Sequence, residues 1–333
     1  MTRLLRTQGV TAPAGFRATG ISAGIKASGA LDLELVFNEG PDHTAAGIFT
    51  RNKVKAAPVL WSQQVLTTGR LRAVVLNSGG ANACTGPLGF QDTHATAEAT
   101  AAALSDWGTE TGAIEVAVCS TGLIGDRLPM DKVLAGVREV VHEMAGGLTG
   151  GEEAARAIMT TDSVPKQVAL HQDNWTVGAM AKGAGMLAPS LATMLCVITT
   201  DAVASPDALR AALNAATATT FDRLDVDGSC STNDTVLLLS SGASEITPSQ
   251  QELTEAIVDG NVRTLAQVQR EVLRLDLLLQ ETPLDRPAVR LQGALVAQRV
   301  QEGSLPHQLQ TLQSQDLLDR AQALHRQWEQ DLE

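Results

Sequence analysis

The sequence predicts a layered α/β protein. Short apolar or β-branched segments alternate with helix-favouring segments over roughly 240 residues, a pattern typical of sheets covered by helices. The chain has 333 residues, of which 44% are hydrophobic and 19% charged, so it can bury a substantial core. Aromatic residues make up only 3%, and there are 29 glycines. We therefore expect a core of Ala, Val, Leu and Ile in which glycines allow close backbone approach.

The first zone, from Thr11 to about Gly122, predicts strands interrupted by one helix. Strands are expected at Leu33–Phe37, Ala73–Leu76 and Ile114–Val118, where apolar runs are bounded by Gly, Asn, Asp and Pro. The Ala-rich segment Thr93–Leu104 favours a helix between two of these strands. This zone is therefore mixed α and β.

The second zone, residues 129–244, continues the alternation. Helices are expected at Met130–Met144 and Ser205–Thr217, the latter with Ser205 as its N-cap and Pro206 in its first turn. Strands are expected at Gln167–Leu170, at Trp175–Met180, in the apolar segment that ends at Thr200, and at Thr235–Leu239. Beyond Asp259 the texture changes, because residues 260–333 hold 13 glutamines and only three glycines. Their Leu and Val spacing predicts two or three amphipathic helices.

Charge and composition exclude several kinds of partner. The formal charge of −12 disfavours binding to nucleic acid or to an anionic membrane. The chain contains no apolar run typical of a signal peptide or a membrane span. The four cysteines form no CxxC pair and the six histidines are scattered, so we expect neither a metal site nor a disulfide framework. Together these features predict a cytoplasmic protein without a metal or cofactor.

The segment Lys182–Asp201 carries the most informative pattern. Gly183, Gly185 and Ala188 fit the GxGxxA fingerprint of dinucleotide sites, although no βαβ unit clearly surrounds them. A purely structural interpretation is a glycine turn that leads into a buried strand. A third interpretation takes Thr193 as a nucleophile. Its hydroxyl would need a base, and its own α-amine could serve only if the bond before it were cut.

Several long motifs resemble one family, the bifunctional ornithine acetyltransferases, or glutamate N-acetyltransferases, of arginine biosynthesis. The resemblance covers about residues 11–258. It is carried by Thr11–Lys26 (TAPAGFRATGISAGIK), DLELVFNEGP, Ala45–Val59 (AAGIFTRNKVKAAPV), Val74–Asp92 (VVLNSGGANACTGPLGFQD), Val118–Lys132 (VCSTGLIGDRLPMDK), Ala157–Lys166 (AIMTTDSVPK), Ala181–Ala202 (AKGAGMLAPSLATMLCVITTDA) and Phe221–Leu239 (FDRLDVDGSCSTNDTVLLL).

The resemblance implies a layered self-cleaving fold and a chain cut between Ala192 and Thr193. The Thr193 hydroxyl would attack the Ala192 carbonyl, and the resulting ester would be hydrolysed. The same hydroxyl would then carry acetyl from N2-acetylornithine to L-glutamate in a ping-pong reaction. In the family, the Thr and Gly of the STG turn form an oxyanion hole, which corresponds here to Thr121 and Gly122. One pair of donors can serve both reactions, because each passes through a tetrahedral oxyanion.

The resemblance also assigns substrate binding to Thr160, Lys182 and Thr193. A lysine suits the α-carboxylate of amino-acid substrates, whereas the residues alone favour a solvated loop lysine at 182 and a helix-terminal cap at 160. The polar run Ser231–Asp234 is either a turn before a strand or a support for the site. Acetyl-CoA is possible as a second acetyl donor. The family implies an assembly of paired α and β chains.

The implied organisation is an α-chain region at 1–192, the start of a β chain with the nucleophile at 193–258, and a divergent helical tail at 259–333. The family's later substrate-binding Glu segment and its terminal Asn and Thr have no counterpart in that tail. Two alternatives to the acetyltransferase therefore stay open. One is an aminopeptidase that uses the same Thr193 nucleophile, and the other is an inactive truncated remnant.

Overall fold

The computed structural model describes residues 3–5, 9–144, 147–162, 165–183, 194–223 and 230–258. All of them belong to one compact unit, Met1–Ala266. The helical tail predicted for 259–333 lies outside the described residues, as do Ala192 and Thr193.

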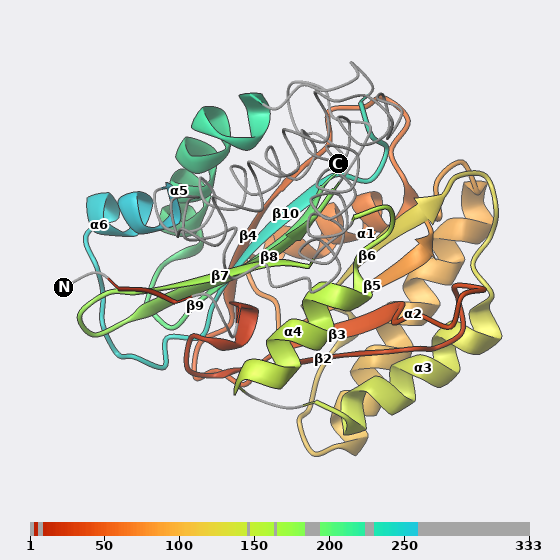
Figure 1. Ribbon diagram of the computed structural model, residues 1–333, viewed down its shortest axis with the longest axis horizontal. Coiled ribbons are helices and arrows are strands. Elements are labelled where there is room, and N and C mark those ends of the chain that lie inside the picture. Colours follow the sequence, from red (N-terminus) through yellow and green to blue (C-terminus); the bar gives the residue numbers. More distant parts are fainter. Residues whose placement is uncertain are drawn as a thin grey trace, which may run out of the picture. The chain divides into compact units, whose positions relative to one another are not determined.

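The larger of the two sheets has six strands in the order β1-β7-β8-β9-β10-β4 (Figure 1). Their bounds are Arg3–Leu5 (β1), Lys166–His171 (β7), Thr176–Lys182 (β8), Leu195–Thr200 (β9), Thr235–Ser240 (β10) and Thr44–Phe49 (β4). β9 and β10 are parallel, with Leu195 opposite Thr235, and β8 is antiparallel to β9, with Lys182 opposite Leu195. The end of β8 therefore meets the starts of β9 and β10 at one edge of the sheet.

The smaller sheet has four strands in the order β2-β3-β5-β6, which are Phe16–Ile21, Leu33–Asn38, Ala73–Gly80 and Val116–Leu123. β5 and β6 are parallel, so their connection must cross over the sheet, and the long helix α2 (Gly86–Asp106) lies in that connection. The two strands finish together, with Gly79 opposite Gly122.

Helices cover the sheets on several sides (Figure 1). Their bounds are Ala57–Val65 (α1), Met130–His142 (α3), Gly147–Ala157 (α4), Pro206–Thr219 (α5) and Gln250–Glu255 (α6). α2 and α3 pack side by side along the smaller sheet, α4 packs against β2, and α5 packs against β4. The predicted cap of α5 is confirmed, because the Ser205 hydroxyl accepts a hydrogen bond from the Ala208 amide at 3.2 Å. These layers confirm the predicted α/β class.

The predicted elements of both zones are present with boundaries shifted by up to seven residues, and the core is aliphatic as expected. The strands β1, β2 and β4 and the helices α1, α4 and α6 were not predicted. Small residues explain two of these, because β4 reads TAAGIF and α4 reads GLTGGEEAARA, and Gly and Ala give little signal for a strand or an amphipathic helix.

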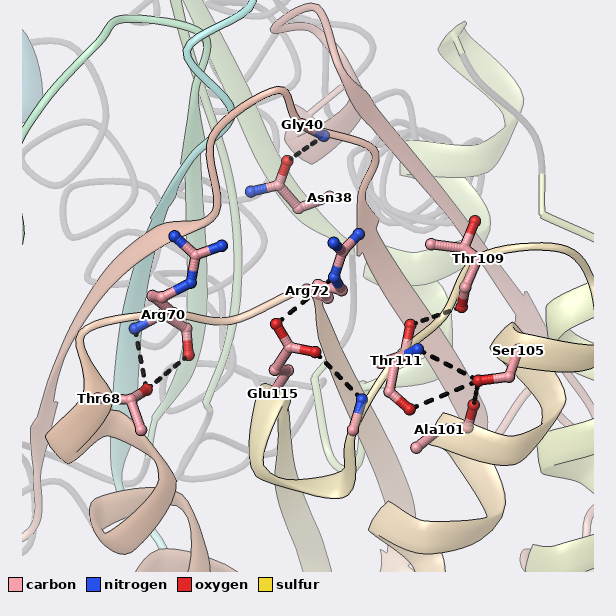
Figure 2. Close-up of polar contacts among 11 residues, drawn as sticks. Asn38, Gly40, Thr68, Arg70, Arg72, Ala101, Ser105, Thr109, Thr111 and Glu115 are labelled. Atoms are coloured by element: carbon pink, nitrogen blue, oxygen red, sulfur yellow. Dashed lines mark hydrogen bonds and ion pairs between the residues drawn. The ribbon is translucent and has the colours of Figure 1, made fainter.

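Polar contacts lie at the starting end of β5 and β6 (Figure 2). Arg72 Nε lies 3.5 Å from Glu115 Oε1, and the other Glu115 oxygen accepts the Gly112 amide at 3.1 Å. The Ser105 hydroxyl accepts the Thr111 amide at 3.2 Å and thereby ties the end of α2 to the segment before β6. These bonds join neighbouring turns and strand starts.

Candidate functional site

The finishing end of β6 places Thr121 and Gly122 together. Gly122 has φ of +131°, a conformation that favours glycine. A Cβ at this position would lie 2.5 Å from the backbone carbon of Gly79 on the neighbouring strand. Only glycine therefore fits, and the close approach of the strands fixes the backbone beside Thr121, which is itself 5% exposed.

Lys182, the last residue of β8, reaches Thr121 from the other sheet. Its Nζ donates a hydrogen bond to Thr121 Oγ1 at 2.9 Å. Lys182 is 2% exposed, so its ammonium is almost completely removed from water. This bond joins the two sheets at the ends of β6 and β8.

Asp162 connects the segment after α4 to the end of β8. Its Oδ1 accepts hydrogen bonds from Lys166 Nζ at 2.5 Å and from the Gly183 amide at 2.8 Å. Its Oδ2 accepts the Thr160 amide at 3.3 Å, and Lys166 also donates to the Gly183 carbonyl at 2.9 Å. Lys166 and Asp162 are both buried. This buried ion pair therefore brings the backbone of Thr160 and the residue after Lys182 to one carboxylate.

Met194, which follows Thr193 in the sequence, is held by residues at the start of β10. Its amide donates to Asp234 Oδ1 at 2.9 Å, and its carbonyl accepts the Thr235 amide at 2.9 Å. Asp234 is fully buried, and its Oδ2 has no hydrogen-bond partner among the described residues. The peptide groups on both sides of the Met194 Cα are therefore fixed.

Asn233 ties the strand ends of the smaller sheet to the larger one. Its side-chain amide donates to the Ala81 carbonyl at 2.6 Å and to the Ser120 carbonyl at 2.8 Å. The Ser120 hydroxyl in turn donates to Asn77 Oδ1 at 2.6 Å. These buried bonds hold the residue immediately before Thr121.

Burial and neighbouring charges shift the pKa values of three groups at this end. Burial lowers the pKa of Lys182 to about 8, against the opposing effect of Asp162 and Asp234. Burial raises the pKa of Asp234 to about 7, although the Met194 amide, Ser231 and Lys182 counteract it. Burial would also raise the pKa of Asp162, but the charges of Lys166 and Lys182 outweigh it, so that pKa is lowered. The site is thus a buried set of coupled charges, as functional sites often are.

The structure brings together Thr121, Gly122, Lys182 and the backbone of Thr160. The Thr160 side chain itself is exposed. Lys182 is buried and bonded, so the alternative of a solvated loop lysine is wrong. Ser231–Asp234 does precede a strand, and two of its side chains bond to the site.

Asp162 and Lys166 were not predicted as site residues, whereas Asn233 lies in the polar run Ser231–Asp234, which was expected to be either a turn or a support for the site. The available signal was an aspartate and a lysine four residues apart at the beginning of an apolar strand. Among the residues described, no cluster of three or more His, Cys, Asp or Glu side chains could hold a metal ion. Within the same residues, none of the helices is both long enough and apolar enough to cross a membrane.

Comparison with known proteins places the chain in a family. The sequence model of the ArgJ family matches residues 17–271. The arginine biosynthesis bifunctional protein ArgJ of Mycobacterium bovis is 83% identical over 258 residues, which are 77% of this chain and 64% of the relative. Its counterpart in Streptomyces coelicolor is 64% identical over 248 residues, 74% of this chain and 63% of the relative. The chain therefore spans somewhat less than two thirds of the length of these relatives.

Solved structures agree with this placement. A Mycobacterium tuberculosis ornithine acetyltransferase complexed with ornithine is 86% identical with a TM-score of 0.57, and the match covers 57% of this chain and 99% of that one. The ArgJ protein of Bacillus halodurans is 36% identical with a TM-score of 0.52, covering 59% of this chain and 98% of that one. A Burkholderia β-aminopeptidase, 14% identical with a TM-score of 0.51 over 83% of this chain and 88% of its own, shares the fold alone. With a family match over most of its length and relatives at up to 83% identity, the chain belongs to the ArgJ family.

Proposed function

We propose that this chain transfers acetyl from N2-acetylornithine to L-glutamate through an acetyl-Thr193 intermediate, after cutting itself between Ala192 and Thr193. In the cut, the Thr193 hydroxyl oxygen attacks the Ala192 carbonyl carbon and the C–N bond breaks. The nitrogen takes up a proton and becomes a free α-amine. Water then hydrolyses the ester, which releases the Ala192 carboxylate and regenerates the hydroxyl.

The transfer uses the same hydroxyl with the new amine as its base. An α-amine has a pKa of about 7.7 to 8.0, close to that required for proton transfer at neutral pH. The Thr193 oxygen attacks the acetyl carbonyl and passes its proton through the amine to the departing ornithine. The amine of glutamate then attacks the acetyl ester, which yields acetylglutamate and the free hydroxyl. Thr121 and Gly122 would stabilise the oxyanion in every one of these steps.

The observation that carries the proposal is the meeting of three segments at the finishing end of β6. Thr121 is bonded to Lys182, Lys182 lies opposite Leu195 across β8 and β9, and Met194 is fixed by Asp234 and Thr235. The residue that precedes Met194 in the sequence is the proposed nucleophile. A hydroxyl donor, a buried cation and the start of the nucleophile's strand are therefore gathered in one place.

Chain lengths give independent support to the cut. The Mycobacterium tuberculosis chain is covered over 99% of its length by 57% of the 333 residues, or about 190 residues. The Bacillus halodurans chain is covered over 98% by 59%, or about 196 residues. Both lengths are close to the 192 residues expected for an α chain, and about half that of the full relatives.

Substrate binding is part of the same proposal. We infer that Lys182, with Thr160 and Thr193, binds the amino-acid substrate, since a protein of charge −12 needs a local cation to hold a carboxylate. The Mycobacterium tuberculosis neighbour is named as a complex with ornithine, which fits a substrate of this class. We also propose that acetyl-CoA can serve as donor, that cut α and β chains assemble together, and that the enzyme works in the cytoplasm.

The experiment has two readouts on the purified full chain. A denaturing gel should resolve two fragments for the wild type and one intact band for Thr193→Ala. Incubation with N2-acetylornithine and glutamate should give steady formation of acetylglutamate, detected by mass spectrometry. An active wild-type preparation that runs as one uncut band contradicts the proposal.

The aminopeptidase alternative differs in the acceptor of the acyl group. The β-aminopeptidase is similar in fold alone. Whether the acyl-enzyme transfers its acyl group to water or to glutamate therefore decides between the aminopeptidase and the acetyltransferase. Release of free acetate or cleaved peptide, with no acetylglutamate, would favour a hydrolase. A cut chain that forms neither product would favour the truncated remnant, an outcome made relevant by the 64% coverage of the relatives.

A further inference from the structure

The hydrogen bond between Lys182 and Thr121 has a direction fixed by chemistry. An ammonium has three donors and no acceptor, so Nζ donates and Thr121 Oγ1 accepts at 2.9 Å. A threonine hydroxyl that accepts this bond keeps its one proton for another acceptor. Among the described residues no acceptor for that proton is found. Within the part of the chain that the structure describes, the Thr121 proton is therefore free to be donated to a group that enters the site.

Lys182 is paired with a hydroxyl, and with no carboxylate among the described residues. It is 2% exposed, and no carboxylate of the described residues lies within ion-pair distance of its Nζ. The nearest buried acid pair is complete without it, because Asp162 is bonded to Lys166. A buried ammonium that donates to a hydroxyl polarises that hydroxyl, since hydrogen bonds to ionised groups are the strong ones and neighbouring bonds reinforce each other at low dielectric.

We propose that Lys182 is a positioning residue for the oxyanion donor, whose charge orients and polarises the Thr121 hydroxyl toward the oxygen that becomes negative in the tetrahedral intermediate. The inference rests on the proposed function. It goes beyond substrate binding because it gives Lys182 a part in self-cleavage, a reaction during which no substrate is bound. A residue that only holds a substrate carboxylate would leave self-cleavage unchanged.

The charge of Lys182 depends on the groups around it. Burial lowers its pKa to about 8, Asp162 and Asp234 raise it, and Lys166 and Lys26 lower it. At pH 7 the lysine is therefore mostly protonated. Its support of Thr121 should fade as the pH rises through about 8.

The test measures self-cleavage of the full chain made by cell-free translation, followed by pulse-chase on a denaturing gel at pH 7. Lys182→Met should slow the cut by about 10- to 100-fold, less than the roughly 100- to 1000-fold cost of losing an oxyanion donor outright. Lys182→Met that cuts at the wild-type rate overturns the inference and leaves the proposed function standing. A wild-type chain that stays whole overturns the proposed function and the inference with it.

A double-substitution cycle tests whether Lys182 acts through Thr121. If it does, Lys182→Met combined with Thr121→Val should be no slower than Thr121→Val alone. Multiplied effects would mean that Lys182 acts by another route, and would overturn the inference. Lys132→Met is the matched control, because Lys132 is exposed and bonds only to the Gly24 carbonyl at 2.6 Å among the described residues; it should cut like the wild type.

The pH dependence separates a charge effect from a folding defect. The ratio of wild-type to Lys182→Met cleavage rates should fall toward one as the pH rises through about 8, whereas a constant ratio between pH 6 and pH 10 overturns the inference. Circular dichroism reports whether each variant is folded. Lys182→Gln, which keeps a donor without the charge, gives the same ratio if the Met variant does not fold.

Discussion

The parallel strands β5 and β6 carry polar groups at both ends, and the two ends differ in burial and reach. At the starting end, Arg72 and Glu115 lie 3.5 Å apart and their side chains are each 24% exposed (Figure 2). At the finishing end, Thr121 and Lys182 are 5% and 2% exposed and their bond joins residues 61 positions apart. A partly exposed ion pair such as Arg72–Glu115 stabilises the fold by up to about 1 kcal/mol. Burying a charge, in contrast, costs free energy unless well-placed hydrogen-bond and ionic partners offset that cost.

This contrast distinguishes the two ends by the state of their charged groups. At the starting end, partly exposed side chains form hydrogen bonds with nearby backbone groups. The finishing end removes the ammonium groups of Lys182 and Lys166 and two carboxylates from water, and the pKa values of Lys182 and of both carboxylates are shifted. Such a costly arrangement is typical of functional sites, where groups need a defined position and charge before a substrate arrives.

The largest expected effect comes from breaking the strand ends at Gly122. Gly122→Ala places a Cβ 2.5 Å from the Gly79 backbone, which must move and displace Thr121. We expect self-cleavage and acetyl transfer to fall by at least about 100-fold, the loss typical of one oxyanion donor. Gly125→Ala is the control, since Gly125 also has positive φ, at +99°, but its Cβ would meet nothing within 4 Å. Equal losses in both variants would mean that backbone conformation, and not crowding, is responsible.

A second prediction compares the stability lost when one carboxylate at each end, Asp162 or Glu115, is neutralised. Asp162→Asn leaves the Lys166 ammonium buried without its counter-charge, and should lower the free energy of unfolding by about 3 to 5 kcal/mol. Glu115→Gln at the starting end should cost less than about 1 kcal/mol. Urea unfolding in the Thr193→Ala background, where the chain stays whole, measures both. Similar losses of unfolding free energy in the two variants would mean that the two ends of β5 and β6 do not differ in this respect.

The third prediction is a change in the slope of stability with pH. Burial raises the pKa of Asp234 to about 7, above the value of about 3.9 expected in the unfolded chain. The folded state therefore binds this proton more tightly, so the stability that it contributes is full below about pH 4 and lost as the pH rises through about 7. Asp234→Asn removes this group. Between pH 4 and pH 7 its stability should fall less than that of the parent, and identical slopes would contradict the assignment.

Local patterns allowed much of the fold to be predicted, because capping and periodicity act over a few residues. Ser205 and Pro206 predict the start of α5, and the apolar run before Ser240 predicts β10. β4 could not be predicted, because its six residues TAAGIF become a strand only by pairing with β10. Pairing between distant segments leaves no mark in either segment alone.

In the candidate site, too, some features could be predicted from the sequence and others depend on contacts between distant segments. The residues Thr121, Gly122 and Lys182 came from a resemblance, and composition alone indicated none of them. The contact between Lys182 and Thr121 depends on two sheets facing each other, which no spacing in the sequence encodes. The run Ser231–Asp234 was recognised as a possible support, but the partner of Asn233 at Ala81 lies 152 positions away and could not be predicted. Asp162 was not predicted, because its bond to the Gly183 amide joins residues 21 positions apart.

The order of the larger sheet has a consequence for the severed protein. β1, β4, β7 and β8 precede the proposed cut, whereas β9 and β10 follow it and lie between β8 and β4. Among the described strands, β9 and β10 would therefore be inserted between strands of the earlier fragment, and neither would lie at an edge of the sheet. After denaturation the two fragments would have to meet by diffusion, so the yield of refolded protein would depend on protein concentration. The native form would persist because it unfolds slowly.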